Sequence, residues 1–132
     1  MLGSLAVALN FFIVHKGPIG LSSATYRRAV HGGQKERVGF YYSMRADCEI
    51  DGYPEVTVER GPSQGSVSTE QGKAYPQYTR DNIRFECDRN LAGATLVFYQ
   101  STPRFRGSDS FTIKVRFPDS TLWSQSYIVD VL

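Results

Sequence analysis

The residues with the most distinctive chemistry are two cysteines, Cys48 and Cys87, which are the only cysteines in the chain. An even number of cysteines in an exported chain indicates a disulfide, and export is what the N-terminal segment predicts below. A bridge would close a loop of about 40 residues and stabilise the fold by roughly 4 kcal/mol. A redox pair would need a C-x-x-C arrangement near a helix, so a structural bridge and two buried free thiols are the alternatives that remain.

Three carboxylates beside the first cysteine have the spacing that opens a calcium-binding loop. They are Asp47, Glu49 and Asp51. Gly52 follows them as in such a loop, but Val58 stands at the twelfth position, where the loop needs a bidentate Glu. The three carboxylates could still hold Ca²⁺ together with Glu55 or Glu59, and a solvated acidic face of a strand is the alternative. We expect no resident cofactor, and calcium is the one candidate metal.

Hydrolytic chemistry lacks its usual base in this sequence. Histidine is the commonest general base, and the chain has two, His15 and His31. His15 lies in an apolar N-terminal segment and His31 in a Gly-containing stretch, so neither predicts a Ser-His-Asp or Cys-His site. Paired carboxylates could serve a glycosidase, but the acidic residues above are expected on a wet face without a cleft. The sequence therefore predicts a protein that is not an enzyme.

Aromatic and arginine side chains in predicted loops form the candidate binding surface. They are Tyr53, Tyr75, Tyr78, Arg104, Phe105 and Arg106. Tyrosine and arginine are favoured anchors at protein interfaces, and exposed aromatic faces also stack on sugars. The alternative is that these rings tuck back over the ends of the fold. A formal net charge of +2 and the absence of a broad basic stripe argue against nucleic acid as a partner.

The elements that must position these residues are short strands. Residues 110–118 alternate between apolar and polar side chains, which is typical of a strand with one buried face. Alternation or compact apolar runs predict further strands at 36–50, 55–60, 66–69, 83–88, 95–100 and 124–131. Phe40, Tyr42, Cys48 and Cys87 are expected on the inward faces of these strands. The pattern predicts an all-β sandwich of about seven to eight antiparallel strands.

Two motifs in the second half of the chain resemble those of a known family. The residues of the first are Tyr99, Pro103, Phe105, Gly107, Asp109, Ser110 and Phe111. They are similar to the Y…P-x-F-x-G-x-D-S-F signature of bacterial immunoglobulin-like, cadherin-like repeats. Pro62, Gly65 and Val67 resemble the P-x-x-G-x-V turn that such repeats carry upstream. The resemblance implies an immunoglobulin-like β-sandwich that serves adhesion, display or spacing without catalysis.

The N-terminus has the character of a secretory signal. Residues 2–14 carry no charge and are almost wholly apolar, yet a bilayer-spanning helix needs about 20 residues. Ser22, Ser23 and Ala24 follow and are small, as signal peptidase requires, so we expect a signal peptide at residues 1–24. An uncleaved interfacial anchor, or a first strand or helix of the fold, are the alternatives.

A basic stretch follows the predicted signal. Residues 25–35 contain Gly32 and Gly33 and predict a flexible lead, so we place the single domain at residues 36–132. Four basic side chains in or beside this lead could contact a phosphate or lipid headgroup, or simply keep it solvated. They are Arg27, Arg28, Lys35 and Arg37.

These observations predict a non-enzymatic extracytoplasmic domain, secreted, periplasmic or in the cell envelope, with a structural, adhesive or protein–protein interaction role. The alternative is a soluble ligand-binding or inhibitor protein that recognises a glycan or a protein through the loop aromatics. We expect a protein or cell-surface partner, no nucleic acid and no integral membrane span. An exposed edge strand could also mediate self-association, and residues 36–44 and 124–131 are its candidates.

Overall fold

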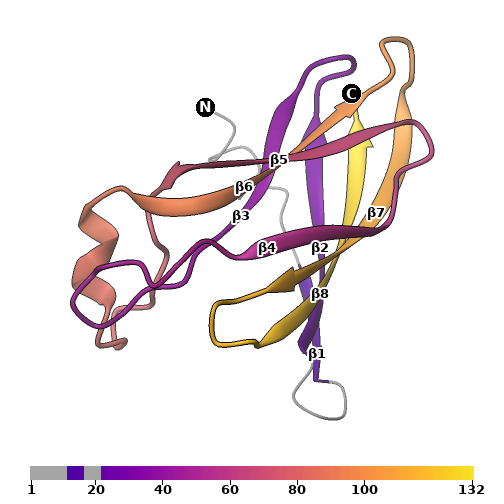
Figure 1. The fold of residues 1–132 in the computed structure, drawn as a ribbon. Coiled ribbons are helices and arrows are strands. Elements are labelled where there is room, and N and C mark those ends of the chain that lie inside the picture. Colours follow the sequence, from indigo (N-terminus) through magenta and orange to yellow (C-terminus); the bar gives the residue numbers. More distant parts are fainter. Residues whose placement is uncertain (1–11, 17–21) are drawn as a thin grey trace.

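The computed structural model describes residues 12–16 and 22–132, and this part of the chain is almost entirely β-structure (Figure 1). Its strands are β1 (Phe12–Lys16), β2 (Ser22–Val30), β3 (Glu36–Tyr41), β4 (Glu55–Arg60), β5 (Gly65–Ala74), β6 (Ala92–Ser101), β7 (Gly107–Arg116) and β8 (Leu122–Val131). A five-stranded sheet has the order β1-β2-β8-β7-β4, and a three-stranded sheet has the order β3-β6-β5. Side chains of both sheets share one core, which confirms the predicted β-sandwich.

One strand pair departs from the antiparallel arrangement that the sequence predicts. Strand β2 runs parallel to β8 in a continuous register from Ser22↔Trp123 to Val30↔Val131. After β2 the chain crosses to β3 in the other sheet, so no hairpin fixes the direction of β2 relative to β8. The same arrangement makes β8 a central strand, which removes residues 124–131 as a candidate edge.

The core confirms the period of two in the strand that follows the turn motif. Phe111, Ile113 and Val115 of β7 are fully buried, whereas the polar residues between them face outward. The rings of Tyr99 and Phe111 stack with centroids 6.2 Å apart, and those of Phe111 and Tyr127 stack at 4.9 Å. Because Tyr99 belongs to one sheet and the other two rings to the other, this stack joins the sheets at their centre.

A bulge in β3 changes which of its residues face the core. The register against β6 shifts between Arg37 and Gly39, so Val38 is an extra residue. Beyond an extra residue the alternation of a strand is reversed. Tyr41 is therefore buried, whereas Phe40 and Tyr42 are only half-buried, and the prediction that these two face inward is wrong.

The disulfide between Cys48 and Cys87 is confirmed, but neither cysteine lies on a strand. Cys48 lies in a turn with a φ of 70°, and Cys87 is buried in the short 3-10 helix η2 (Phe85–Arg89). The bridge joins residues 42–54 to residues 75–91. We call these two segments together the disulfide lobe. Figure 1 shows this lobe at the left of the sandwich.

Local side-chain hydrogen bonds explain why the strand predicted at 36–50 ends at Tyr41 and why the strand predicted at 83–88 is absent. The backbone N–H of Glu49 donates to Asp47 Oδ1 at 3.0 Å, and that of Arg84 donates to Asn82 Oδ1 at 2.8 Å. Short Asp and Asn side chains offer the backbone a turn in place of a strand ladder. The alternation of charged and apolar residues was therefore not a reliable strand signal in these two stretches.

The stretch predicted as a flexible lead is mostly a strand. Residues 25–30 belong to β2, where Ala29 and Val30 are buried, and Arg27 forms a 2.7 Å ion pair with Asp130 of β8. The domain thus begins before residue 36. Most of the predicted signal peptide, residues 1–11 and 17–21, lies outside the described residues, and the cleavage point expected after Ala24 falls within β2.

Candidate binding groove

A groove of about 580 Å³ runs along the outer side of β3, and we call it the β3 groove. Among the described strands β3 has one neighbour, β6, so its other edge faces this groove. Every residue from Arg37 to Met44 contributes to the lining. The remaining lining residues come from β2, the lobe, the β7–β8 turn and β8, and are Tyr26, Arg28, Gln77, Tyr78, Arg84, Phe117, Asp119, Thr121, Trp123 and Tyr127.

Aromatic rings on the β3 side form one wall of the groove. The rings of Phe40 and Tyr42 stack with centroids 6.0 Å apart, and Tyr78 of the lobe meets Tyr42 edge-on at 5.6 Å. The backbone N–H of Gln77 donates to the Tyr42 hydroxyl at 2.9 Å and fixes its position. Burial raises the pKa of both Tyr42 and Tyr78, so both hydroxyls remain protonated donors near neutral pH.

The opposite wall comes from the five-stranded sheet. Phe117 packs edge-on against Trp123 at 4.5 Å, and Tyr26 lies 5.4 Å from Tyr127. At the floor, the hydroxyls of Tyr127 and Tyr41 share a 2.5 Å hydrogen bond. Burial raises the pKa of Tyr127 to about 12 and also raises the pKa of Tyr41 well above its ordinary value, so the floor is neutral.

Three arginines stand along the groove. Arg28 Nε donates to the carbonyl oxygen of Val38 at 2.8 Å, and its guanidinium lies over the ring of Tyr26. Arg84 Nε donates to the carbonyl oxygen of Met44 at 2.9 Å. Arg37 lies over the ring of Phe40, 5.1 Å from its centroid. The three positive charges face one acidic lining residue, Asp119, so the groove is electropositive.

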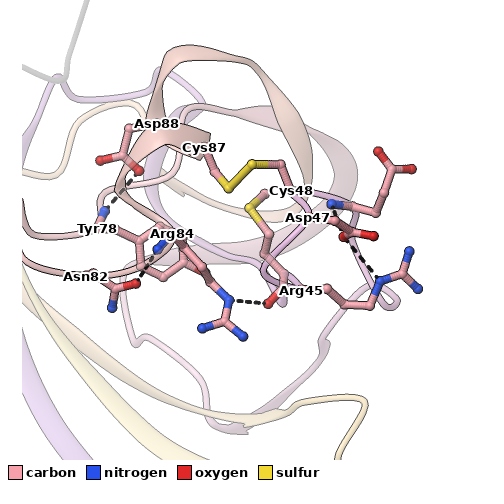
Figure 2. Close-up of a disulfide and its surroundings, with 10 residues drawn as sticks. Arg45, Asp47, Cys48, Tyr78, Asn82, Arg84, Cys87 and Asp88 are labelled. Atoms are coloured by element: carbon pink, nitrogen blue, oxygen red, sulfur yellow. Dashed lines mark hydrogen bonds and ion pairs between the residues drawn. A yellow bond between two sulfur atoms is a disulfide. The ribbon is translucent and has the colours of Figure 1, made fainter.

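The disulfide lobe supplies and holds one end of this groove. Figure 2 shows the Cys48–Cys87 bridge between the segment that carries Arg45 and the segment that carries Tyr78 and Arg84. Asp88 accepts a 3.1 Å hydrogen bond from the backbone N–H of Tyr78, which ties the wall residue to the 3-10 helix. The bridge therefore fixes the two lobe segments that face each other across the end of the groove.

The structure separates the aromatic and arginine residues that the sequence nominates for binding. Tyr78 lines the groove, whereas Tyr75 is exposed beyond β5, and Tyr53 lies beside Gly93 at the start of β6. The turn with Arg104, Phe105 and Arg106 follows the far end of β6. Ten extended residues span roughly 33 Å, and Figure 1 shows the turn at the upper right, away from the lobe.

The turn residues have internal roles at their own end of the sandwich. Phe105 packs against the core, and Arg106 donates to the carbonyl oxygens of Pro103 and Phe105 at 3.2 and 2.8 Å. Arg104 is exposed. The six nominated residues therefore do not form one site.

The two family-like motifs converge on the buried carboxylate of Asp109. The hydroxyl of Tyr99 donates to it at 2.7 Å, and the backbone N–H groups of Ser63 and Gln64 donate at 3.0 Å each. Ser110 adds a backbone N–H at 2.9 Å. Burial raises the pKa of Asp109, but the hydrogen bonds from Tyr99 and the three backbone groups outweigh it, so the pKa lies below its ordinary value.

The carboxylates nominated for calcium are not gathered into a site. Within the part of the chain that the structure describes, no three His, Cys, Asp or Glu side chains are placed to hold a metal ion together. Asp47 instead accepts hydrogen bonds from its own turn and from Arg45. Asp47 thus lies in a turn, and Glu49 and Asp51 lie in irregular backbone just after it, rather than on the wet face of a strand.

Of the lining residues, Tyr78 alone was nominated for the aromatic binding surface. Arg28 and Arg37 were predicted only as possible phosphate or headgroup contacts and Phe40 as a core residue, whereas Tyr26 and Trp123 were missed. They lie far apart in the chain, and a prediction of faces from alternation fails beyond the β3 bulge. The one usable signal was the pairing of arginine and aromatic residues in Tyr26–Arg28 and in Arg37–Phe40. Among the described residues, no helix is long and apolar enough to cross a membrane.

No protein-family model matches the sequence, and no curated protein matches it either. Among solved structures, the solution structure of amebosin is similar, with a TM-score of 0.42 and 12% sequence identity. The match covers 88% of this chain and 100% of amebosin. A similarity at this level carries no conclusion about function.

Proposed function

We propose that this chain is a non-enzymatic, extracytoplasmic immunoglobulin-like domain that binds a protein partner through the β3 groove. The observation that carries the proposal is the lining of the groove, where aromatic rings and three arginines meet along an edge strand. Tyrosine, tryptophan and arginine are the residues that most often dominate binding energy at protein interfaces. Half-buried rings that remain accessible in a groove are suited to that role.

One feature supports an extracytoplasmic location, and a second supports the absence of catalysis. A disulfide persists in oxidising surroundings, such as the periplasm or the outside of the cell. His31 is exposed at the β2–β3 turn, contacts Glu36 at 3.1 Å and does not line the groove. The resemblance to bacterial immunoglobulin-like, cadherin-like repeats adds support for an adhesive or interaction role.

Site-specific photo-crosslinking in the native host tests the proposed function. A photoreactive amino acid at Tyr42 should give a discrete protein adduct, and one at Thr57 should not, because Thr57 is exposed on β4 at the edge of the other sheet. The adduct should disappear when Arg84 is replaced by Ala. Equal adducts from both positions, or none from Tyr42, would refute binding through this groove.

A glycan is the second candidate, because the rings of Tyr42, Tyr78 and Trp123 offer faces on which sugars stack. The same crosslinker would then yield an adduct that glycosidase treatment shortens and protease treatment of the partner does not. That outcome would favour the soluble ligand-binding protein over the protein–protein interaction domain.

A further inference from the structure

We propose that the partner supplies an extended acidic segment that adds to the edge of β3 that no described strand covers, between Arg37 and Arg84. This inference rests on the proposed function and names the chemistry of the partner. It follows from three properties of the groove, which are its backbone edge, its two ends and its charge.

The backbone edge suits a strand. Residues of both alternating sets, from Arg37 to Met44, line the groove, which is expected when a groove follows the edge of a strand rather than one of its faces. Strand β3 has β6 on one side only among the described strands. An unpaired edge is a template on which an extended peptide forms backbone hydrogen bonds.

Arginines stand at both ends of this edge, Arg37 within β3 and Arg84 in the lobe. Arg28 binds the carbonyl oxygen of Val38, and Arg84 binds that of Met44. Met44 lies six positions after Val38, which a fully extended chain would span in roughly 20 Å. Arg28 already occupies the edge at Val38, so the segment open to an added strand runs from Gly39 to Tyr42.

The charge of the groove selects an acidic segment. Within residues 22–132 no carboxylate lies within ion-pair distance of Arg37 or Arg84. Asp119 is the one acidic residue of the lining, and its carboxylate accepts the backbone N–H of Thr121. Carboxylates at the two ends of a bound strand would meet the guanidinium groups of Arg37 and Arg84, which can bind them with paired hydrogen bonds.

The walls would receive the other side chains of such a strand. Successive residues of an added strand point to opposite faces. One set would face Phe40 and Tyr42, and the other would face Tyr26 and Trp123. A continuous backbone edge flanked by rings on both sides favours a peptide over a glycan, because a glycan has no regular series of donors and acceptors to pair with it.

A displayed library of random peptides tests the inference on the full oxidised chain. Selection should enrich peptides with Asp or Glu near both ends, and counter-selection against an Arg37→Ala/Arg84→Ala variant should remove them. The best peptide should bind Arg84→Ala at least about tenfold more weakly. Arg60→Ala is the matched control, because Arg60 also bonds to a backbone carbonyl, that of Ser110, but on β4, and its loss should leave the Kd unchanged.

Hydrogen exchange shows where the peptide binds. Bound peptide should slow exchange of those amides between Gly39 and Tyr42 that face away from β6. Three results would overturn the inference: selected peptides without acidic enrichment, selected peptides that bind the double variant equally well, or a library that yields no groove-dependent binder. It would also be overturned if oligogalacturonate, an acidic glycan, slowed the exchange of these amides and no peptide did. A Tyr42 adduct in the host together with any of these results would leave the proposed function standing and refute the acidic strand alone.

Discussion

At the scale of single residues, Asp109 connects more of the molecule than any other side chain we describe. Its carboxylate receives hydrogen bonds from β6, from β7 and from the turn between β4 and β5. The sequence motifs contain the donors and the acceptor, but they are up to 46 residues apart in the chain. Their meeting explains why both motifs occur in one domain.

Replacing Asp109 with Asn should lower the free energy of unfolding by roughly 3 kcal/mol, because charge-assisted hydrogen bonds are lost in a buried place. The pKa of Asp109 is depressed in the folded state, so its stabilising effect is complete above the unfolded pKa of about 3.9 and is lost as the pH falls through the lower folded value. Urea unfolding from about pH 7 to about pH 3 checks both points, and the variant should lose less stability than the wild type over the acidic part.

Asp81→Asn is the control for this experiment, since Asp81 is an exposed carboxylate in the lobe that bonds to Thr79. It should leave the unfolding curve almost unchanged. Equal stability of wild type and Asp109→Asn near neutral pH would contradict the proposed role of Asp109.

Gly39 is required by a close approach between the sheets. A Cβ at this position would lie 2.2 Å from the Tyr127 hydroxyl, which is held in the core by Tyr41. Gly39→Ala should therefore cost about 2 kcal/mol through overpacking. Gly61→Ala should cost far less, because nothing lies within 4 Å of a Cβ there. Thermal unfolding of the two variants side by side measures the difference, and coincident melting curves would show that β3 can move away.

At the scale of elements, the disulfide holds the two segments of the lobe together and does not link the two sheets. It joins a turn to a 3-10 helix, and both segments continue into residues of the β3 groove. Loss of the bridge should therefore act on the lobe and the end of the groove before it acts on the sandwich.

The Cys48→Ser/Cys87→Ser variant should become sensitive to trypsin at Arg80, Arg84 and Arg89 of the lobe, because loop closure no longer restrains them. Peptide masses from a timed digest identify the sites. Arg104 and Arg106, on the distant β6–β7 turn, serve as internal controls and should be cut at the same rate in both forms. Uniform acceleration at all five sites would mean that the bridge stabilises the whole domain instead.

At the scale of the whole molecule, β2 belongs to the domain and pairs with one edge of the central strand β8. Val30 is fully buried and Ala29 is nearly so, and the parallel pairing continues through nine residues of each strand. Residues 25–30, which the sequence predicts to be part of a flexible lead, therefore contribute to the hydrophobic core.

Two truncated chains test this conclusion. Residues 25–132 retain most of β2 and should fold cooperatively, whereas residues 36–132 should melt at least roughly 10 °C lower or fail to fold, since buried apolar area and a strand are lost. Circular dichroism during heating gives both melting temperatures. Matching values would show that β2 is dispensable and that the domain does begin at residue 36.

The sequence by itself determined the parts of this protein that depend on local pattern. Alternation predicted β4, β7 and β8, the two cysteines predicted their bridge, and the series of short strands separated by turn residues predicted the sandwich, because these signals are patterns of residue type along the chain. Only the tertiary structure decided the parallel β2–β8 pair, the reversed alternation of β3 after its bulge, and the site. The groove takes residues from Tyr26 to Tyr127 and exists only where an edge strand, a clamped lobe and the opposite sheet meet. No local pattern encodes that meeting, because it depends on how the two sheets pack.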